Sequence, residues 1–188
     1  EGFTVYFENR IMEEIFGKDF ANMLALLSYE DLLEEIEWLK SENRAADTRL
    51  RVDLDGRNPD DGLTGIPYDK GYFLLRLIEE TVGREEWDTF LNTYFDEFQF
   101  KVMTSEAFLF YLDQMLLSKN PEWNKTIKIK DWVYGEGLPE SCPQIVSSQF
   151  EKVDAQMTNW ENGTAASELE SSEWMTPQWL YLINQLND

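Results

Sequence analysis

The sequence predicts an all-α protein. Apolar residues recur at helical spacing along most of its 188 residues, and Gly and Pro gather between these stretches. Hydrophobic residues make up 43% and aromatic residues 14% of the chain, far more than a disordered chain carries. We therefore expect a folded, aromatic-rich helical protein with a substantial core.

Two helices are predicted in the first quarter of the chain. The first covers residues 1–16 and ends at Gly17, which is placed as a C-terminal stop. The second presents one apolar face, made of Phe20, Met23, Leu24, Leu27, Leu32, Ile36 and Leu39. Residues 47–54 alternate between polar and apolar, which predicts a short extended segment. The loop RNPDDGLTGIP follows it, rich in turn-forming residues.

Three strongly periodic helices are predicted next. The first begins near Pro67 and ends at Gly83, and the second begins near Arg84. The third stops before Asn120-Pro121, because a residue that precedes proline disfavours helix. The second helix has an apolar stripe formed by Trp87, Phe90, Leu91, Tyr94, Phe95 and Phe98. We interpret such stripes as core and not as ligand sites.

The last part of the chain predicts two further helices. One covers residues 146–160, and the polar segment ENGTAASELESSE after it is linker-like. Thr176 is the expected N-cap of the last helix, with Pro177 at its first position. The apolar face of that helix consists of Trp179, Leu182, Ile183 and Leu186.

Charge and composition exclude several functions. The formal net charge of −21 repels phosphate backbones and anionic membrane surfaces, so nucleic acid and membranes are poor partners. Cationic ligands, such as peptides with a free amino terminus, would be attracted, although solubility alone also explains the charge. Cys142 is the only cysteine, so no intrachain disulfide can form. With no histidine, the chain by itself cannot build a Ser-His-Asp, Cys-His or histidine-zinc site.

Two local features carry candidate chemistry. Glu1 and Glu8 are seven residues apart, so both face one side of the first helix. One carboxylate could bind a metal while the other orients a neighbouring ligand, and a solvated acidic face is the simpler alternative. Tyr68 follows Pro67 at the entrance to a helix, where its phenol could donate a hydrogen bond to a developing oxyanion. The alternative for Tyr68 is a structural tyrosine that covers the core.

Four segments together resemble gluzincin aminopeptidases. EGFTVYFENR resembles the segment after the HExxH helix, which supplies the third zinc ligand in that family. GIPYDKGYFLLRLIEETVG resembles the proline-tyrosine-glutamate-lysine-glycine motif, with Asp69 in the acidic place. WDTFLNTYFDEFQFKVMTSEAFLFYL is similar to the following helical pair of the leukotriene hydrolase branch, and DWVYGEGLP is similar to the segment that closes that catalytic domain. The matches occur in the family's order over nearly the whole chain.

The resemblance implies an internal piece of a zinc aminopeptidase of the leukotriene hydrolase type. Glu1 would be a zinc ligand, and Tyr68 would stabilise the tetrahedral intermediate formed when activated water attacks a peptide carbonyl. Glu8 would orient a ligand, and Asp60 would line the substrate cleft. The two zinc histidines and the general-base glutamate are expected upstream of Glu1. Leu63 stands where that branch can carry a tyrosine, so we expect peptide hydrolysis and not epoxide hydrolysis.

The resemblance also implies a domain organisation. Residues 1–140 would form the helical lobe of a thermolysin-like catalytic domain. Residues 141–188 would be a linker and the first helices of a helical-repeat C-terminal domain. We expect the isolated chain to be helical, inactive on peptides, without tightly bound zinc, and able to self-associate through an uncovered helix face. The alternative, from another class, is a non-catalytic helical interaction module whose acidic surface binds a basic partner.

Overall fold

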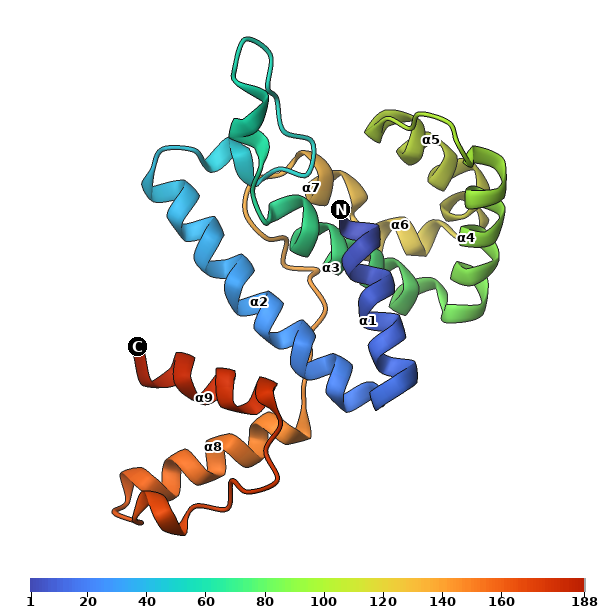
Figure 1. Ribbon diagram of the computed structural model, residues 1–188. Helices are drawn as coiled ribbons and strands as arrows, with labels where there is room; N and C mark the ends of the chain where they lie inside the picture. Colours follow the sequence, from blue (N-terminus) through green and yellow to red (C-terminus); the bar gives the residue numbers. More distant parts are fainter. Residues whose placement is uncertain (188) are drawn as a thin grey trace. The chain divides into compact units, whose positions relative to one another are not determined.

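The computed structural model describes residues 1–187, and these contain helices and connecting segments but no β-strand (Figure 1). The all-α prediction is therefore confirmed. The α-helices are α1 (Gly2–Phe16), α2 (Lys18–Ser41), α3 (Ile66–Val82), α4 (Arg84–Phe98), α5 (Ser105–Met115), α6 (Pro121–Ile127), α7 (Ile129–Tyr134), α8 (Ser148–Glu161) and α9 (Thr176–Asn187). Short 3₁₀ helices are η1 (Ala45–Thr48), η2 (Pro59–Gly62), η3 (Leu117–Lys119) and η4 (Ala166–Glu168). No helix within residues 1–187 is long and apolar enough to cross a membrane.

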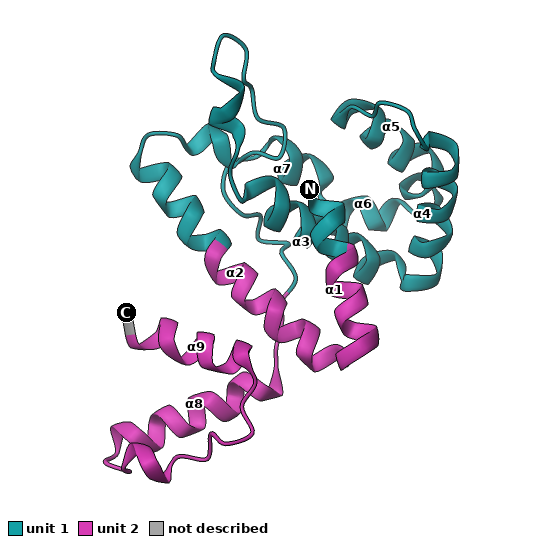
Figure 2. Ribbon diagram, in the orientation of Figure 1, with its two compact units in different colours: residues 1–6, 32–143 teal, residues 7–31, 144–188 magenta. Residues whose placement is uncertain are grey.

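The chain forms two compact units (Figure 2). The first unit contains residues 1–6 and 32–143, and the second contains residues 7–31 and 144–188. Helices α1 and α2 thus contribute residues to both units. The domain boundary near residue 140 stays a prediction.

Helix α3 is the centre of the first unit. It contacts α4, α6 and α7, and its side chains from Lys70 to Leu75 are all buried. Gly83, with a φ of 91°, ends α3 and directly precedes α4. A left-handed backbone suits glycine at such a position. The predicted boundary between these two helices is therefore confirmed.

Aromatic side chains fill the space beside α3. Phe90 and Tyr94 of α4 stack on one another with ring centroids 6.0 Å apart. Phe3, near the start of α1, contacts Tyr94 and also Phe108 of α5. The apolar stripe of α4 is core, as predicted, for Trp87, Phe90, Leu91 and Tyr94, which are buried. Phe95 lies at the edge of the stripe and is 43% exposed.

Two expectations for the first unit were wrong or incomplete. The extended segment predicted for residues 47–54 is wrong at its start, where Asp47 and Thr48 belong to η1, whereas Arg49 has an extended backbone with φ −79° and ψ 142° and residues 49–54 have no regular structure. The physical reason is local: the Asp47 N–H donates to the Arg44 carbonyl and the Thr48 hydroxyl donates to the Ala45 carbonyl, which closes a 3₁₀ turn. Helices α6 and α7 were not predicted. Asn120 does end the preceding helical pattern, but its side chain also caps the next helix by accepting the Glu122 N–H.

In the second unit, α8 begins slightly later than predicted. Ser147 is its N-cap and accepts the Gln149 N–H. The Asp19 carboxylate accepts hydrogen bonds from the Ser148 backbone N–H and hydroxyl. Val146, expected on the apolar face of this helix, precedes it and is 64% exposed.

Helix α9 also begins one residue away from the prediction. The Gln178 side chain accepts the Met175 N–H at 3.0 Å, as a capping-box residue does toward an N-cap. Met175 therefore occupies the N-cap position that was expected for Thr176. Tyr181 of α9 stacks on Phe150 of α8 at 4.2 Å, which joins these two helices.

Candidate functional site

The start of α1 crosses α3 at direct backbone contact. A Cβ atom added to Gly2 would lie 2.7 Å from the Gly71 carbonyl carbon, and one added to Gly71 would lie 2.9 Å from the Gly2 Cα atom. Real Cβ atoms do not come so close to backbone. The pair of glycines therefore permits the crossing, which was not predicted from the sequence. Gly71 could have indicated it, because glycine destabilises the interior of a helix and usually occurs there where close packing requires it.

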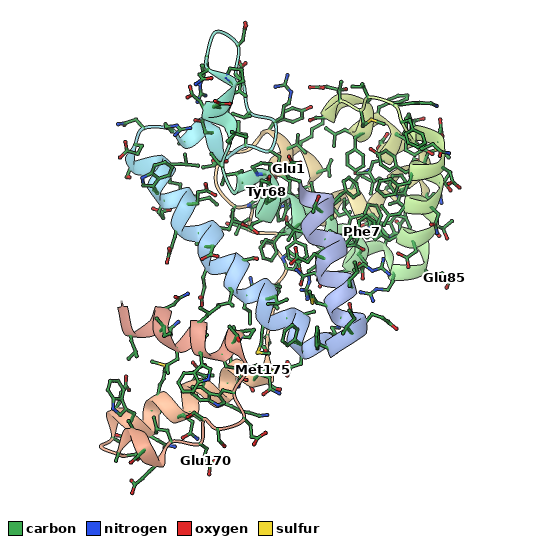
Figure 3. All side chains as sticks on the ribbon, in the orientation of Figure 1. Glu1, Phe7, Tyr68, Glu85, Glu170 and Met175 are labelled. Atoms are coloured by element: carbon green, nitrogen blue, oxygen red, sulfur yellow. The ribbon has the colours of Figure 1, made fainter. Side chains whose placement is uncertain are left out.

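This crossing brings Glu1 and Tyr68 into one region of the first unit (Figure 3). Glu1 directly precedes Gly2, and its carbonyl accepts the first helical N–H, from Thr4, at 2.9 Å. Tyr68 lies in the first turn of α3, one turn before Gly71. Glu1 is exposed and Tyr68 is 43% exposed, so both side chains reach solvent.

The first turn of α3, which carries Tyr68, is anchored where the helix begins. The Gly65 backbone N–H donates to the Glu35 carboxylate at 2.9 Å, and Ile66 is fully buried. Pro67 in the first turn fixes the backbone angle φ that a helix requires. The Tyr68 backbone is therefore held by groups other than its phenol.

Lys70 provides a second anchor for α3. It is fully buried, and its Nζ donates to the Thr48 carbonyl at 2.8 Å and the Gly135 carbonyl at 3.0 Å. The Thr48 hydroxyl in turn accepts the Gly137 N–H at 2.8 Å. Burial, with a smaller contribution from Arg49, lowers the pKa of Lys70 to about 8. One side chain thus joins η1, α3 and the segment after α7.

We expect Lys70 to make unfolding depend on pH. Its folded pKa of about 8 lies below the ordinary value of 10.5, so between these values the unfolded chain binds more protons. The free energy of unfolding of the wild type should then rise with pH relative to that of Lys70→Met, by up to about 3 kcal/mol. Urea unfolding of both chains between about pH 7 and about pH 10 measures this. A difference that does not change with pH would contradict it, and exposed Lys125→Met is the control.

Asp60 lies in η2, on the loop that precedes α3. It is exposed, and its backbone N–H donates to the Asn58 side chain at 3.3 Å. Glu1, Tyr68 and Asp60 all belong to the first unit. The Gly2–Gly71 contact relates Glu1 to Tyr68, whereas Asp60 shares with them only the first unit. Glu8 is exposed and belongs to the second unit.

A charge cluster that joins this loop to η1 was not predicted from the sequence. Asp47 is only 4% exposed and accepts a bidentate pair of hydrogen bonds from Arg57, at 2.6 and 2.8 Å. Arg44 donates to the same carboxylate at 2.8 Å. The hydrogen bond from Arg57, with a smaller contribution from Arg44, lowers the pKa of Asp47 to about 2. Asp47 is therefore ionised throughout the neutral range.

The zinc that the resemblance implies requires a donor set that this chain does not offer. A catalytic zinc site commonly uses three protein ligands that include histidine. The sequence has no histidine, and within residues 1–187 no three Cys, Asp or Glu side chains gather to hold a metal ion. Glu1 therefore fits only as one member of a larger ligand set.

Comparison with known proteins gives a family. Residues 1–130 match the family model described as Peptidase family M1 domain. A leukotriene A-4 hydrolase homolog of Botryotinia fuckeliana is 30% identical over 167 residues, covering 86% of this chain and 25% of its own length. A leucine aminopeptidase 2 of Phaeosphaeria nodorum is 34% identical over 142 residues, covering 74% of this chain and 22% of its own length.

A solved structure gives the same result. The native leukotriene A4 hydrolase of Saccharomyces cerevisiae superimposes with a TM-score of 0.86 at 26% identity. The match covers 99% of this chain and 31% of that protein. The chain thus spans between a fifth and a third of the length of these relatives. With the family model matched over residues 1–130 of 188, the chain belongs to peptidase family M1.

Proposed function

We propose that the complete protein containing this chain is a zinc aminopeptidase that removes N-terminal residues from peptides. Membership of peptidase family M1 supports this. The observation that carries the proposal is the backbone crossing of Gly2 and Gly71, because it gathers Glu1 and Tyr68 at one exposed place. In the proposal, Glu1 is a zinc ligand and Tyr68 acts on the substrate.

Tyr68 has the properties of an oxyanion donor. When water attacks a peptide carbonyl, negative charge develops on the carbonyl oxygen, and a donor that is already in place stabilises this charge. We propose that the phenol hydroxyl of Tyr68 is such a donor, because the side chain is 43% exposed and its backbone belongs to an anchored helical turn. The anchored backbone limits how far the hydroxyl must move to reach the carbonyl oxygen.

A peptide is the favoured substrate over an epoxide. The relatives are named for both activities, as leukotriene A-4 hydrolase homolog and as leucine aminopeptidase 2. Leu63 stands at the position where a second tyrosine would be expected for epoxide chemistry, and it is 79% exposed and has no hydroxyl. The exposed carboxylate of Asp60 and the net charge of −21 favour a cationic amino terminus over nucleic acid or anionic membranes.

The test is chelator-sensitive release of amino acids by the complete protein, with Glu1→Gln as the diagnostic variant. A neutral amide oxygen is a poorer zinc ligand than a carboxylate, so Glu1→Gln should lose zinc to a mild chelator and lose turnover with it. Metal content after dialysis and hydrolysis of an aminoacyl anilide are the two measurements. Glu14→Gln, exposed on the same helix and without a proposed role, shows whether any lost acidic group has this effect. Unchanged zinc content in Glu1→Gln would contradict the ligand role.

The isolated chain should behave differently. It offers Glu1 alone as an expected ligand, so we propose that it folds, binds no zinc tightly, hydrolyses no peptide and self-associates through an uncovered face of α1. Circular dichroism, zinc titration and sedimentation examine these points. Zinc-dependent turnover by the purified chain would overturn the assignment, because the chain has no histidine to account for it.

A further inference from the structure

The loop that carries Asp60 has little apolar anchoring of its own. All residues from 55 to 61 are exposed. Gly62 packs against Leu54, where an added Cβ would lie 2.8 Å from a Leu54 methyl carbon. Next in the chain, Leu63 is 79% exposed. A loop with so few buried groups is held chiefly by its polar contacts.

Arg57 supplies the polar contact at the start of this loop. Its guanidinium donates two hydrogen bonds to the buried Asp47 carboxylate, at 2.6 and 2.8 Å. The same guanidinium lies 3.6 Å from the Asp61 carboxylate. Arg44 adds a bond of 2.8 Å to the Asp61 carbonyl. The planar guanidinium forms two hydrogen bonds with one carboxylate, which fixes the direction of the arginine side chain as well as its distance. A lysine ammonium would fix only the distance.

The other end of the loop is fixed separately. The Gly65 N–H bonds to Glu35 at 2.9 Å, and the buried Ile66 follows. Residues 58–64 therefore form an arch with Asp60 on it, held by Arg57 at its start, by Arg44 at the Asp61 carbonyl and by the Gly65 contact at its end. Loss of the Arg57 contact would loosen the start of the arch and leave the first turn of α3 in place.

We propose that Arg57, held by Asp47, is a positioning residue that sets where the Asp60 carboxylate meets the substrate. This rests on the proposed aminopeptidase function and deepens it. Because Tyr68 is anchored through Gly65 and Lys70, its position does not depend on Arg57. Loss of Arg57 therefore weakens substrate binding and leaves the chemical step intact.

The first experiment is amide hydrogen exchange on the 188-residue chain, which needs no activity. Arg57→Met should speed exchange several-fold at Asp60, Asp61 and Leu63, whose N–H groups bond within the arch. Exchange in α4 should not change. Arg51→Met is the matched control, because Arg51 pairs with exposed Glu106 and does not contact Asp47. Unchanged exchange in the arch of Arg57→Met would overturn the proposal.

The second experiment is steady-state kinetics of the complete protein on an aminoacyl anilide. Arg57→Met should raise KM about tenfold, with kcat within about twofold of the wild type. Asp47→Asn should do the same. In an Asp60→Asn background, Arg57→Met should have no further effect on KM, because the group that it positions is gone. If Arg57 had only a structural role, the effect of Arg57→Met on KM would be the same with Asp or Asn at position 60.

The outcomes separate this inference from the proposed function. Equal losses in kcat and kcat/KM, or an unchanged KM beside faster exchange, would overturn the positioning role while the aminopeptidase assignment stands. A full additional effect of Arg57→Met in the Asp60→Asn background would overturn it as well. If the wild-type complete protein hydrolyses no peptide, the proposed function fails and the substrate role of Arg57 fails with it.

Discussion

Replacing Tyr68 by Phe in the complete protein is expected to lower kcat by roughly 10²- to 10³-fold, the usual loss when one oxyanion donor is removed. The ring remains and only the hydroxyl is deleted. The backbone of this turn is held by Gly65 and Ile66, and no hydroxyl is needed for that. KM and stability should therefore change little. The measurement is kcat and KM on an aminoacyl anilide, with thermal unfolding in parallel.

Tyr134→Phe is the matched control for this prediction. Tyr134 is the last residue of α7 and is 43% exposed, the same fraction as Tyr68. It has no proposed role in the reaction, so its loss should leave kcat near the wild-type value. Near-normal kcat in Tyr68→Phe, or an equal loss in both variants, would remove the oxyanion role.

Much of the helical fold follows from local sequence signals. Gly17 and Gly83 both have positive φ and both end helices where predicted. The periodic stripe of α4 marks buried residues because a 3.6-residue period is a local property of the chain. Local signals failed where one residue has two roles: Asn120 follows one helical pattern and caps the next helix.

The arrangement around the candidate site was less predictable, because it depends on contacts between distant residues. Lys70 bonds to a carbonyl 65 residues away, and nothing near Lys70 in the sequence indicates this partner. The bond between Arg57 and Asp47 spans ten residues across a loop, and neither residue has a periodic pattern around it. The resemblance indicates Glu1, Tyr68 and Asp60, whereas the groups that hold this part of the first unit together become neighbours only in the folded chain.

The crossing of α1 and α3 gives the second large expected effect, for Gly71→Ala. Alanine in the interior of a helix is normally about 1 kcal/mol more favourable than glycine. Here its Cβ would lie 2.9 Å from the Gly2 Cα atom, and backbone cannot rotate away as a side chain can. We therefore expect the 188-residue chain to lose roughly 1–3 kcal/mol of unfolding free energy, the usual cost of overpacking. Urea unfolding measures whether alanine lowers the unfolding free energy here, where in most helices it would raise it.

The same substitution tests whether the crossing matters for function. Relief of the clash must move the start of α1, and with it Glu1, away from the turn that carries Tyr68. A displacement of about 1 Å can cost roughly 10²-fold in rate, so kcat of the complete Gly71→Ala protein should fall by about this factor. Asn92→Ala is the control, because Asn92 is exposed on α4 and has no proposed role in the reaction. If Gly71→Ala were as stable and as active as Asn92→Ala, the backbone contact of α1 with α3 would not be what aligns Glu1 with Tyr68.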